Sequence, residues 1–309
     1  MAARRSAGAA RRTRRSARAR TARGGAAPTC GTTSPRSETP MPVLSRAALP
    51  TGVELEYLDA GDGDPVLFLH GYVDSWYSFA GVVAALPAGL RAIAPSQRGH
   101  GDSGKPEGSY TVAGFADDAV ALLDMLGLER AVACGHSMGS FVALELALSH
   151  PHRVSRLALV GGATTADNDA LRGLQRDVDG LVDPVDRLFA ETFQAGTLSR
   201  PLAADVMRTI LGETAKAPAH VWRAALAGLV AWRPSHPLGS ISCPTWIAWG
   251  NKDEIFPQEE QRALAAQIPG AVSKFYDAGH APHWELPALF AADLAAFATG
   301  QEVPGAERA

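Results

Sequence analysis

Short, almost wholly apolar runs recur along most of the chain and predict the strands of a parallel sheet. Such runs suit strands buried on both faces, and the segments between them carry apolar residues at helical spacing. Strands that alternate with helices imply βαβ units, so we expect an α/β fold with a mostly parallel central sheet flanked by helices. The expected strands are 52–58, whose alternation indicates a half-buried edge strand, and 65–70, 90–95, 131–134, 154–160, 244–250 and 272–276.

The segments between these strands predict the helices of the core. Thr111 is placed to cap a helix that ends near Leu126, before Gly127. We expect the chain after 300 to be frayed. The other expected helices are 76–86, a run that starts at Met138, 258–267, and 282–298, whose buried face would hold Leu286, Leu289, Phe290, Leu294 and Phe297.

The alternation stops between residues 164 and 235, where no strand pattern occurs. Four helical segments take its place, at 167–181, 184–195, 199–212 and 217–231. An insertion that follows a strand emerges at the carboxyl edge of the sheet, and its apolar side needs a partner surface. We therefore expect a helical cap, 164–235, over a core formed by 41–163 and 236–309.

The formal charge of −3 conceals a basic tail on an acidic body. Residues 1–40 hold ten arginines and one glutamate, which leaves the rest of the chain at −12. The acidic body argues against nucleic-acid binding by the core. The tail lacks large apolar residues, so we expect disorder. It could be an arm for anionic partners, a targeting peptide, or sequence upstream of a true start at Met41.

Cysteine spacing and hydropathy indicate the compartment. Cys30, Cys134 and Cys243 show no paired spacing, so we expect no disulfides and a reducing, cytoplasmic environment. No apolar run approaches the ~20 residues of a membrane span, so we expect no membrane association.

The chemistry centres on Gly135-His136-Ser137-Met138-Gly139, which joins a strand to a helix. A serine at the tip of so sharp a turn is held in a strained backbone with its Oγ exposed, and its flanking glycines let strand and helix approach. The following helix directs its free N–H groups at the same spot, where they would stabilise an oxyanion. A glycine-rich turn with a capping serine is the plainer interpretation.

A serine nucleophile needs a base and an acid that orients the base, both at carboxyl ends of strands. Asp253 follows the strand that ends at Gly250, and His280 follows the last strand. Asp253 could instead cap a turn. His283 competes with His280, but it follows Pro282 in the first turn of a helix, where packing is the usual role; His70, His100 and His136 are expected to be structural.

With these three residues in their segments, the sequence resembles the α/β-hydrolase superfamily, in its capped, small-molecule serine hydrolase branch. The resemblance implies Ser137 as nucleophile, His280 as base, Asp253 as orienting acid, and the N–H groups of Tyr72 and Met138 as oxyanion hole. The matching segments, which span about residues 50 to 300, are His70-Gly71-Tyr72 with Trp76, Arg98-Gly99-His100-Gly101-Asp102-Ser103, Gly135 to Gly139, Trp249 to Asp253, and Gly279-His280.

Three positions depart from the superfamily's patterns. Ser96 often is aspartate and Ser140 often is glycine, for which we expect only effects on supporting contacts. Serine at 137 argues against dehalogenase and epoxide hydrolase relatives, which use an aspartate nucleophile. Ala281 replaces the tryptophan that follows the histidine in many carbon–carbon bond hydrolases.

We therefore expect a serine hydrolase of a small-molecule ester, lactone or related carbonyl compound, working through an acyl-enzyme without cofactor or metal. A haloperoxidase-like perhydrolase or a carbon–carbon bond hydrolase would use the same three residues, and a ligand-binding module is a third class. The expected substrate contacts are Trp76, Phe189, Phe193, Met207 and Trp222, besides Tyr72 and Met138.

Overall fold

The structure is a computed structural model that describes residues 44–108 and 110–308. The expectations for the tail 1–40, for Cys30 and for a start at Met41 lie outside these residues. Within them, no helix is long and apolar enough to cross a membrane. Cys134 and Cys243 are both free thiols.

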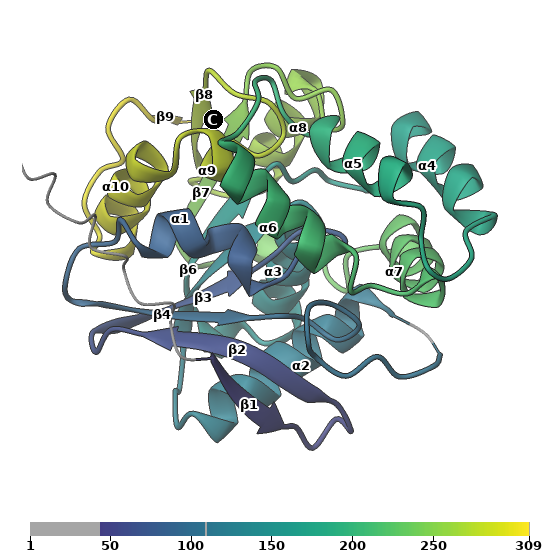
Figure 1. The fold of residues 1–309 in the computed structure, drawn as a ribbon. Helices are drawn as coiled ribbons and strands as arrows, with labels where there is room; N and C mark the ends of the chain where they lie inside the picture. The colour runs from purple at the N-terminus through teal and green to yellow at the C-terminus, as the bar shows by residue number, and fades with distance from the viewer. Residues whose placement is uncertain (1–43, 109, 309) are drawn as a thin grey trace, which may run out of the picture. The chain divides into compact units, whose positions relative to one another are not determined.

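Across the described ranges, nine strands form one sheet in the order β1-β2-β4-β3-β5-β6-β7-β8-β9 (Figure 1). The strands from β4 to β8 in this order run parallel, whereas the pairs β1–β2, β2–β4 and β8–β9 are antiparallel. The expected α/β fold is confirmed. The strands are Leu44–Ala48, Glu54–Ala60, Asp64–Leu69, Leu90–Pro95, Ala131–His136, Val154–Val160, Thr245–Gly250, Val272–Tyr276 and Glu307–Arg308 for β1 to β9.

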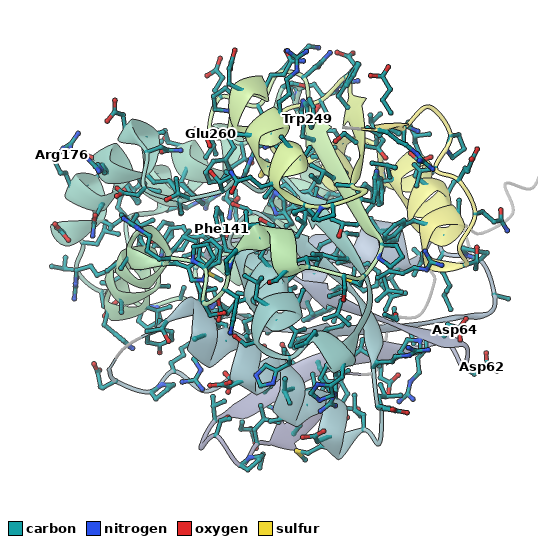
Figure 2. All side chains as sticks on the ribbon, turned by 180° about the vertical axis from the view of Figure 1, so that it is seen from behind. Asp62, Asp64, Phe141, Arg176, Trp249 and Glu260 are labelled. Atoms are coloured by element: carbon teal, nitrogen blue, oxygen red, sulfur yellow. The ribbon has the colours of Figure 1, made fainter. Side chains whose placement is uncertain are left out.

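Alternate residues of each central strand enter two separate hydrophobic cores. In β3, Leu67 and Leu69 belong to one core, which we call the first core, and Val66 and Phe68 belong to the second core. The reason is that successive side chains point to opposite faces of a sheet. Burial on both faces explains why these strands are nearly continuous apolar runs. Phe141 lies inside the first core (Figure 2), with Trp232 and Phe256 as ring neighbours.

Helices of the core cover both faces of the sheet. On one face α2 (Val112–Met125) packs against α3 (Met138–Ser149), and on the other α1 (Ala80–Val83) packs against α10 (Pro287–Ala298) (Figure 1). The remaining core helices are the 3₁₀ helices η1 (Trp76–Phe79), η2 (Pro151–Arg153) and η3 (Leu238–Ser240), and the α-helices α8 (Gln258–Gln267) and α9 (Pro282–Glu285).

Four α-helices lie in the chain between β6 and β7. Trp222 and Leu226 of the last of them are fully buried in the same core as Phe141. The helices are α4 (Asp169–Asp179), α5 (Arg187–Ala195), α6 (Ala204–Thr214) and α7 (Ala219–Ala231), and we call residues 164–235 the cap.

The structure corrects three expectations about the elements. β2 is not an edge strand, because β1 pairs along its outer side. The segment after residue 300 does not fray throughout, since β9 pairs with β8 and Val303 is buried. The expected helix 282–298 divides into α9 and α10 before Pro287, and Leu289 is 47% exposed because α10 turns that residue away from the sheet.

Candidate active site

Ser137 lies at the tip of the turn between β5 and α3 with a strained backbone. Its φ is 50° and its ψ is −117°, a conformation that non-glycine residues rarely adopt. The Ser137 N–H donates to the carbonyl of Val160, 2.9 Å away, so neighbouring strand β6 holds the turn from its side. Strain of this kind is kept only where the surroundings impose it, as at a functional site.

The two flanking glycines are required by close backbone contacts, as the sequence predicts. A Cβ on Gly135 would lie 2.0 Å from the carbonyl oxygen of Gly139. A Cβ on Gly139 would lie 1.9 Å from the carbonyl oxygen of Leu69, at the end of β3. Strand and helix therefore meet at a separation that only glycine permits.

Asp253 and His280 form a buried hydrogen-bonded pair. His280 Nδ1 donates to Asp253 Oδ2 at 2.8 Å, and both side chains are almost fully buried. The other oxygen, Oδ1, accepts the N–H groups of Ile255 and Phe256 at 2.8 and 3.0 Å. The turn expected around Asp253 thus exists, but it leaves one carboxylate oxygen free to hold the imidazole.

The loop that carries His280 is held from the cap. The N–H of His280 donates to the carbonyl of Thr197, 2.8 Å away, just after α5. Glu285, whose side chain is fully buried, accepts from the N–H groups of Gly279 and Ser199 at 2.8 and 2.9 Å. The position of the histidine ring therefore depends on the cap as well as on β8.

The other histidines have structural partners. His283 Nε2 lies 3.2 Å from Ser78 Oγ, and His136 Nε2 donates to the carbonyl of His280 at 3.1 Å. His70 Nε2 accepts the N–H of Gln97. Burial lowers the pKa values of His70, His136 and His283 well below the ordinary value, and lowers that of His100 to about 4, so these rings are neutral.

Ser137 and His280 line one small cavity of about 30 Å³. Among the described residues, His280 Nε2 is buried without a hydrogen-bond partner. In the described ranges, no hydrogen bond joins it to Ser137 Oγ. The other lining residues are Gly71, Tyr72, Asp74, His136, Leu171, Phe193, Gln194, Thr197, Leu226, Leu229, Ile255 and Trp284.

Of the two backbone donors expected for an oxyanion hole, Tyr72 lines this cavity and Met138 directly follows Ser137. Met138 is the first residue of α3, so its N–H has no acceptor within the helix. The N–H of Tyr72 donates to no acceptor within residues 44–108 and 110–308. The Tyr72 ring is fixed by its hydroxyl, which donates to the carbonyl of Trp222 at 2.5 Å.

Of the five expected substrate contacts, the structure brings only Phe193 into the cavity. Trp222 and Phe189 stack behind it, with ring centroids 5.5 Å from each other, and Trp222 is fully buried. Trp76 packs inside the core below α10. Met207 lines a different cleft, on α6. Helical spacing identifies an apolar face but not which neighbour that face meets.

Asp74 and Gln194 are polar residues of the cavity that were not among the expected site residues. Gln194 Nε2 donates to Asp74 Oδ1 at 3.1 Å, and Ser78 Oγ donates to the other oxygen at 3.4 Å. Burial raises the pKa of Asp74 to about 7. A polar residue two positions after an expected oxyanion donor was the available sequence signal for Asp74. Leu226 and Leu229 also had a sequence signal, namely the helical spacing of apolar residues in 217–231.

Two of the positions that depart from the superfamily's pattern, Ser96 and Ser140, have local hydrogen-bond partners. Ser96 Oγ donates to a buried carboxylate supplied from β2, that of Glu56, at 3.3 Å. The hydroxyl of Ser140 donates to the carbonyl of Ser137 at 2.6 Å. It occupies space left by Gly162, where a Cβ would lie 2.6 Å from that hydroxyl. Among the described residues, no group of three His, Cys, Asp or Glu side chains is arranged to hold a metal ion.

Known proteins share this sequence pattern and fold. The model of a family described as alpha/beta hydrolase fold matches residues 64–287. The chain is 32% identical over 240 residues to a pimeloyl-[acyl-carrier protein] methyl ester esterase of Aromatoleum aromaticum, covering 72% of this chain and 93% of the relative. It is 29% identical over 265 residues to a 2-hydroxymuconate semialdehyde hydrolase of a Pseudomonas species, which covers 79% of this chain and 88% of the relative.

A solved structure, that of a thermophilic esterase from Thermogutta terrifontis, superposes with a TM-score of 0.74 at 28% identity. The match covers 82% of this chain and 97% of that one. The chain belongs to the α/β-hydrolase fold family. It is a hydrolase of this family, and its relatives include esterases.

Proposed function

We propose that the protein hydrolyses a small-molecule ester, lactone or related carbonyl compound through an acyl-enzyme on Ser137. The observation that carries the proposal is the buried Asp253–His280 pair, whose free Nε2 faces the cavity of the strained serine. The relative named as a methyl ester esterase and the esterase structure support an ester substrate.

In the proposed reaction, His280 Nε2 removes the proton of Ser137 as Oγ attacks the substrate carbonyl. Asp253 holds the ring in the tautomer with Nδ1 protonated and stabilises the imidazolium that forms. His280 then protonates the leaving alcohol. Water, activated by the same nitrogen, releases the acid and restores Ser137.

The tetrahedral oxyanion would be bound by the N–H groups of Met138 and Tyr72. The positive end of the α3 dipole points at the same place. Because such donors are fixed where the negative charge develops, loss of one would lower turnover by about 100-fold or more. The three residues would equally serve perhydrolysis or carbon–carbon bond cleavage. Hydrogen-peroxide-dependent halogenation, and release of acid from a semialdehyde substrate, distinguish these alternatives.

We further propose a small-molecule substrate as the only partner needed for turnover, and the cytoplasm as the site of action. The two free thiols, Cys134 and Cys243, agree with a reducing compartment.

The test is fluorophosphonate labelling with peptide mapping, together with ester hydrolysis by variants. We expect one adduct, on Ser137, and loss of turnover by about 10⁴-fold or more in Ser137→Ala and in His280→Ala. His283→Gln is the matched control, because His283 bonds to Ser78 outside the cavity; it should keep turnover within tenfold. An adduct on another residue, or unchanged turnover in Ser137→Ala, would refute the assignment.

A further inference from the structure

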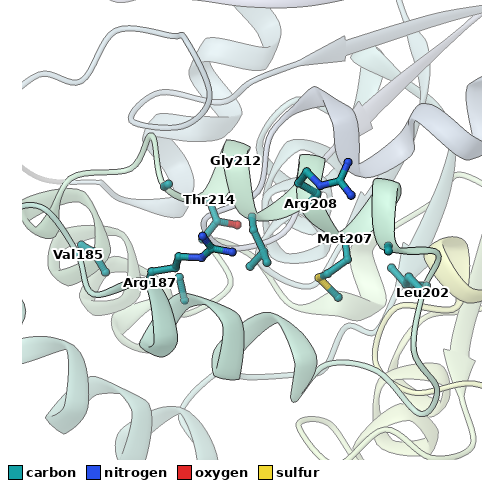
Figure 3. Close-up of a pocket in the computed structure, with 11 residues that line it drawn as sticks. Val185, Arg187, Leu202, Met207, Arg208, Gly212 and Thr214 are labelled. Atoms are coloured by element: carbon teal, nitrogen blue, oxygen red, sulfur yellow. The ribbon is translucent and has the colours of Figure 1, made fainter.

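A second cavity, of about 590 Å³, opens between α5 and α6 of the cap (Figure 3). We call it the α5–α6 cleft. In Figure 3, Met207 of α6 and Arg187 at the start of α5 point into the space between the two helices. The cleft lies close to the catalytic cavity but is separate from it, so the two volumes have to be considered together.

The two volumes differ in what they can hold. A cavity of about 30 Å³ has room for about one water molecule, not for an ester bonded to Ser137. Sites for small molecules have volumes of about 300–1,000 Å³, a range that includes the cleft. Any substrate that reaches Ser137 must therefore extend beyond this small cavity, and the cleft is a neighbouring space of sufficient size.

The side chains of Gln194 and Thr214 lie between the two spaces. Gln194, which is 1% exposed, lines the catalytic cavity, and its Nε2 donates to Thr214 Oγ1 at 2.8 Å. Thr214 in turn lines the cleft. Since the same Nε2 also donates to Asp74, the path Asp74–Gln194–Thr214 runs from the catalytic cavity to the cleft. Rotation of the Gln194 carboxamide would break this hydrogen-bonded link between the two spaces.

The lining of the cleft indicates what it binds. Eight of its eleven lining residues have no polar side-chain atoms except the thioether of Met207. Two arginines also line the cleft: Arg187, which is paired with Glu191 at 2.7 Å, and Arg208. The mainly apolar surface suits an apolar chain. The eight residues are Val185, Ala190, Leu202, Ala204, Met207, Leu211, Gly212 and Ala215.

We propose that the α5–α6 cleft is the subsite for an extended apolar chain of the substrate, and that Gln194 is the gate that joins it to the catalytic cavity. The proposal rests on the proposed function, since it names the substrate class of that site. The chain could belong to the acyl or to the alcohol part of an ester, and the two parts share the same chemistry toward the cleft.

The first test fills the cleft. A Cβ on Gly212 would meet nothing within 4 Å, so Gly212→Trp places an indole in the cleft without a backbone clash. Each buried methylene contributes a factor of about four to binding. We therefore expect the ratio of kcat/KM for p-nitrophenyl octanoate over acetate to fall at least tenfold. A parallel series of octyl and ethyl acetate assigns the cleft to the alcohol part if only that ratio falls.

Gly173→Trp is the matched control, because Gly173 is also a cap-helix glycine with room for a side chain, but lies outside the cleft. Its ratios of kcat/KM for the long-chain over the short-chain ester should equal those of the wild type in both series. Gln194→Ala should raise the octanoate-to-acetate ratio by several fold, since it removes the larger of the two side chains between the spaces. Equal ratios in wild type, Gly212→Trp and Gln194→Ala in both series would overturn the proposal.

A binding measurement separates this proposal from the proposed function. Titration calorimetry with octanoate and with 1-octanol should show at least tenfold weaker binding of one of them to Gly212→Trp, and no change in Gly173→Trp. If no ester is hydrolysed but this difference appears, the chain subsite stands and the hydrolytic assignment fails. If short esters are hydrolysed and neither ratio nor binding differs, the subsite fails alone.

Discussion

Asp74 is a buried carboxyl group whose partners are hydrogen-bond donors, Gln194 and Ser78. Hydrogen bonds from Gln194 and Ser78 satisfy its oxygens, yet burial keeps its pKa near 7, well above the ordinary value of 3.8. The folded protein therefore binds a proton that the unfolded chain releases between about pH 4 and pH 7. Over that interval Asp74 lowers the free energy of unfolding as pH rises.

We predict that Asp74→Asn stabilises the protein, and more so at pH 8 than at pH 5. The amide is never ionised. The gain in the free energy of unfolding at pH 8 should therefore exceed the gain at pH 5 by up to about 3 kcal/mol. Urea unfolding at both pH values measures it. Asp62→Asn, at an exposed turn, is the control and should change neither value. An Asp74→Asn gain that is equal at both pH values would contradict the raised pKa.

At the scale of elements, the strand–turn–helix unit of Ser137 is defined by how closely β3, β5 and α3 approach. Gly139 lies against the carbonyl of Leu69 and Gly135 against that of Gly139. α3 is buried on all sides, so it cannot move outward without opening the first core. The backbone strain at Ser137 is maintained by these fixed contacts.

We predict that Gly139→Ala lowers the free energy of unfolding by about 1–3 kcal/mol or more, because the new methyl group overlaps the β3 backbone. Gly173→Ala in α4 is the control, since its Cβ would have only Arg176 Nη2 nearby, at 3.7 Å; it should stabilise by a few tenths to about 1 kcal/mol. Chemical denaturation measures both. Equal effects of the two substitutions would show that the contact is not tight.

For the whole molecule, the described core holds several neutral buried histidines. Those at 70, 100, 136 and 283 have pKa values lowered by burial. The unfolded chain protonates them near pH 6.5, whereas the folded protein does not. Their contribution to stability is therefore present above pH 6.5 and is lost as pH falls below it.

We predict that the free energy of unfolding falls steeply between pH 6.5 and pH 5. Each neutral histidine contributes up to about 1.4 kcal/mol per pH unit, and Asp74 offsets about one of them. Urea titrations at half-unit steps measure the slope. His100→Asn should reduce the slope by up to about 1.4 kcal/mol per pH unit, the contribution of one histidine, whatever its effect on absolute stability. A stability that is constant or rises toward pH 5 would exclude neutral histidines in the folded state.

The sequence by itself determined the alternation of elements, the turn at Ser137 and the chain order of Ser137, Asp253 and His280. These follow from local periodicity and from the rule that parallel strands share one carboxyl edge, so residues after different strands meet there. The resemblance to the α/β-hydrolases, carried by short ordered motifs, pointed to the family that the comparisons confirm.

Only the tertiary structure decided which histidine bonds to Asp253, where Met207 and Trp222 lie, and that β9 pairs with β8. It also joined Asp74 to Gln194, 120 positions apart in the chain. The physical reason is common to all of these. Periodicity reports whether a face is buried, whereas hydrogen-bond partners and cavity walls depend on distances between segments that are remote in sequence.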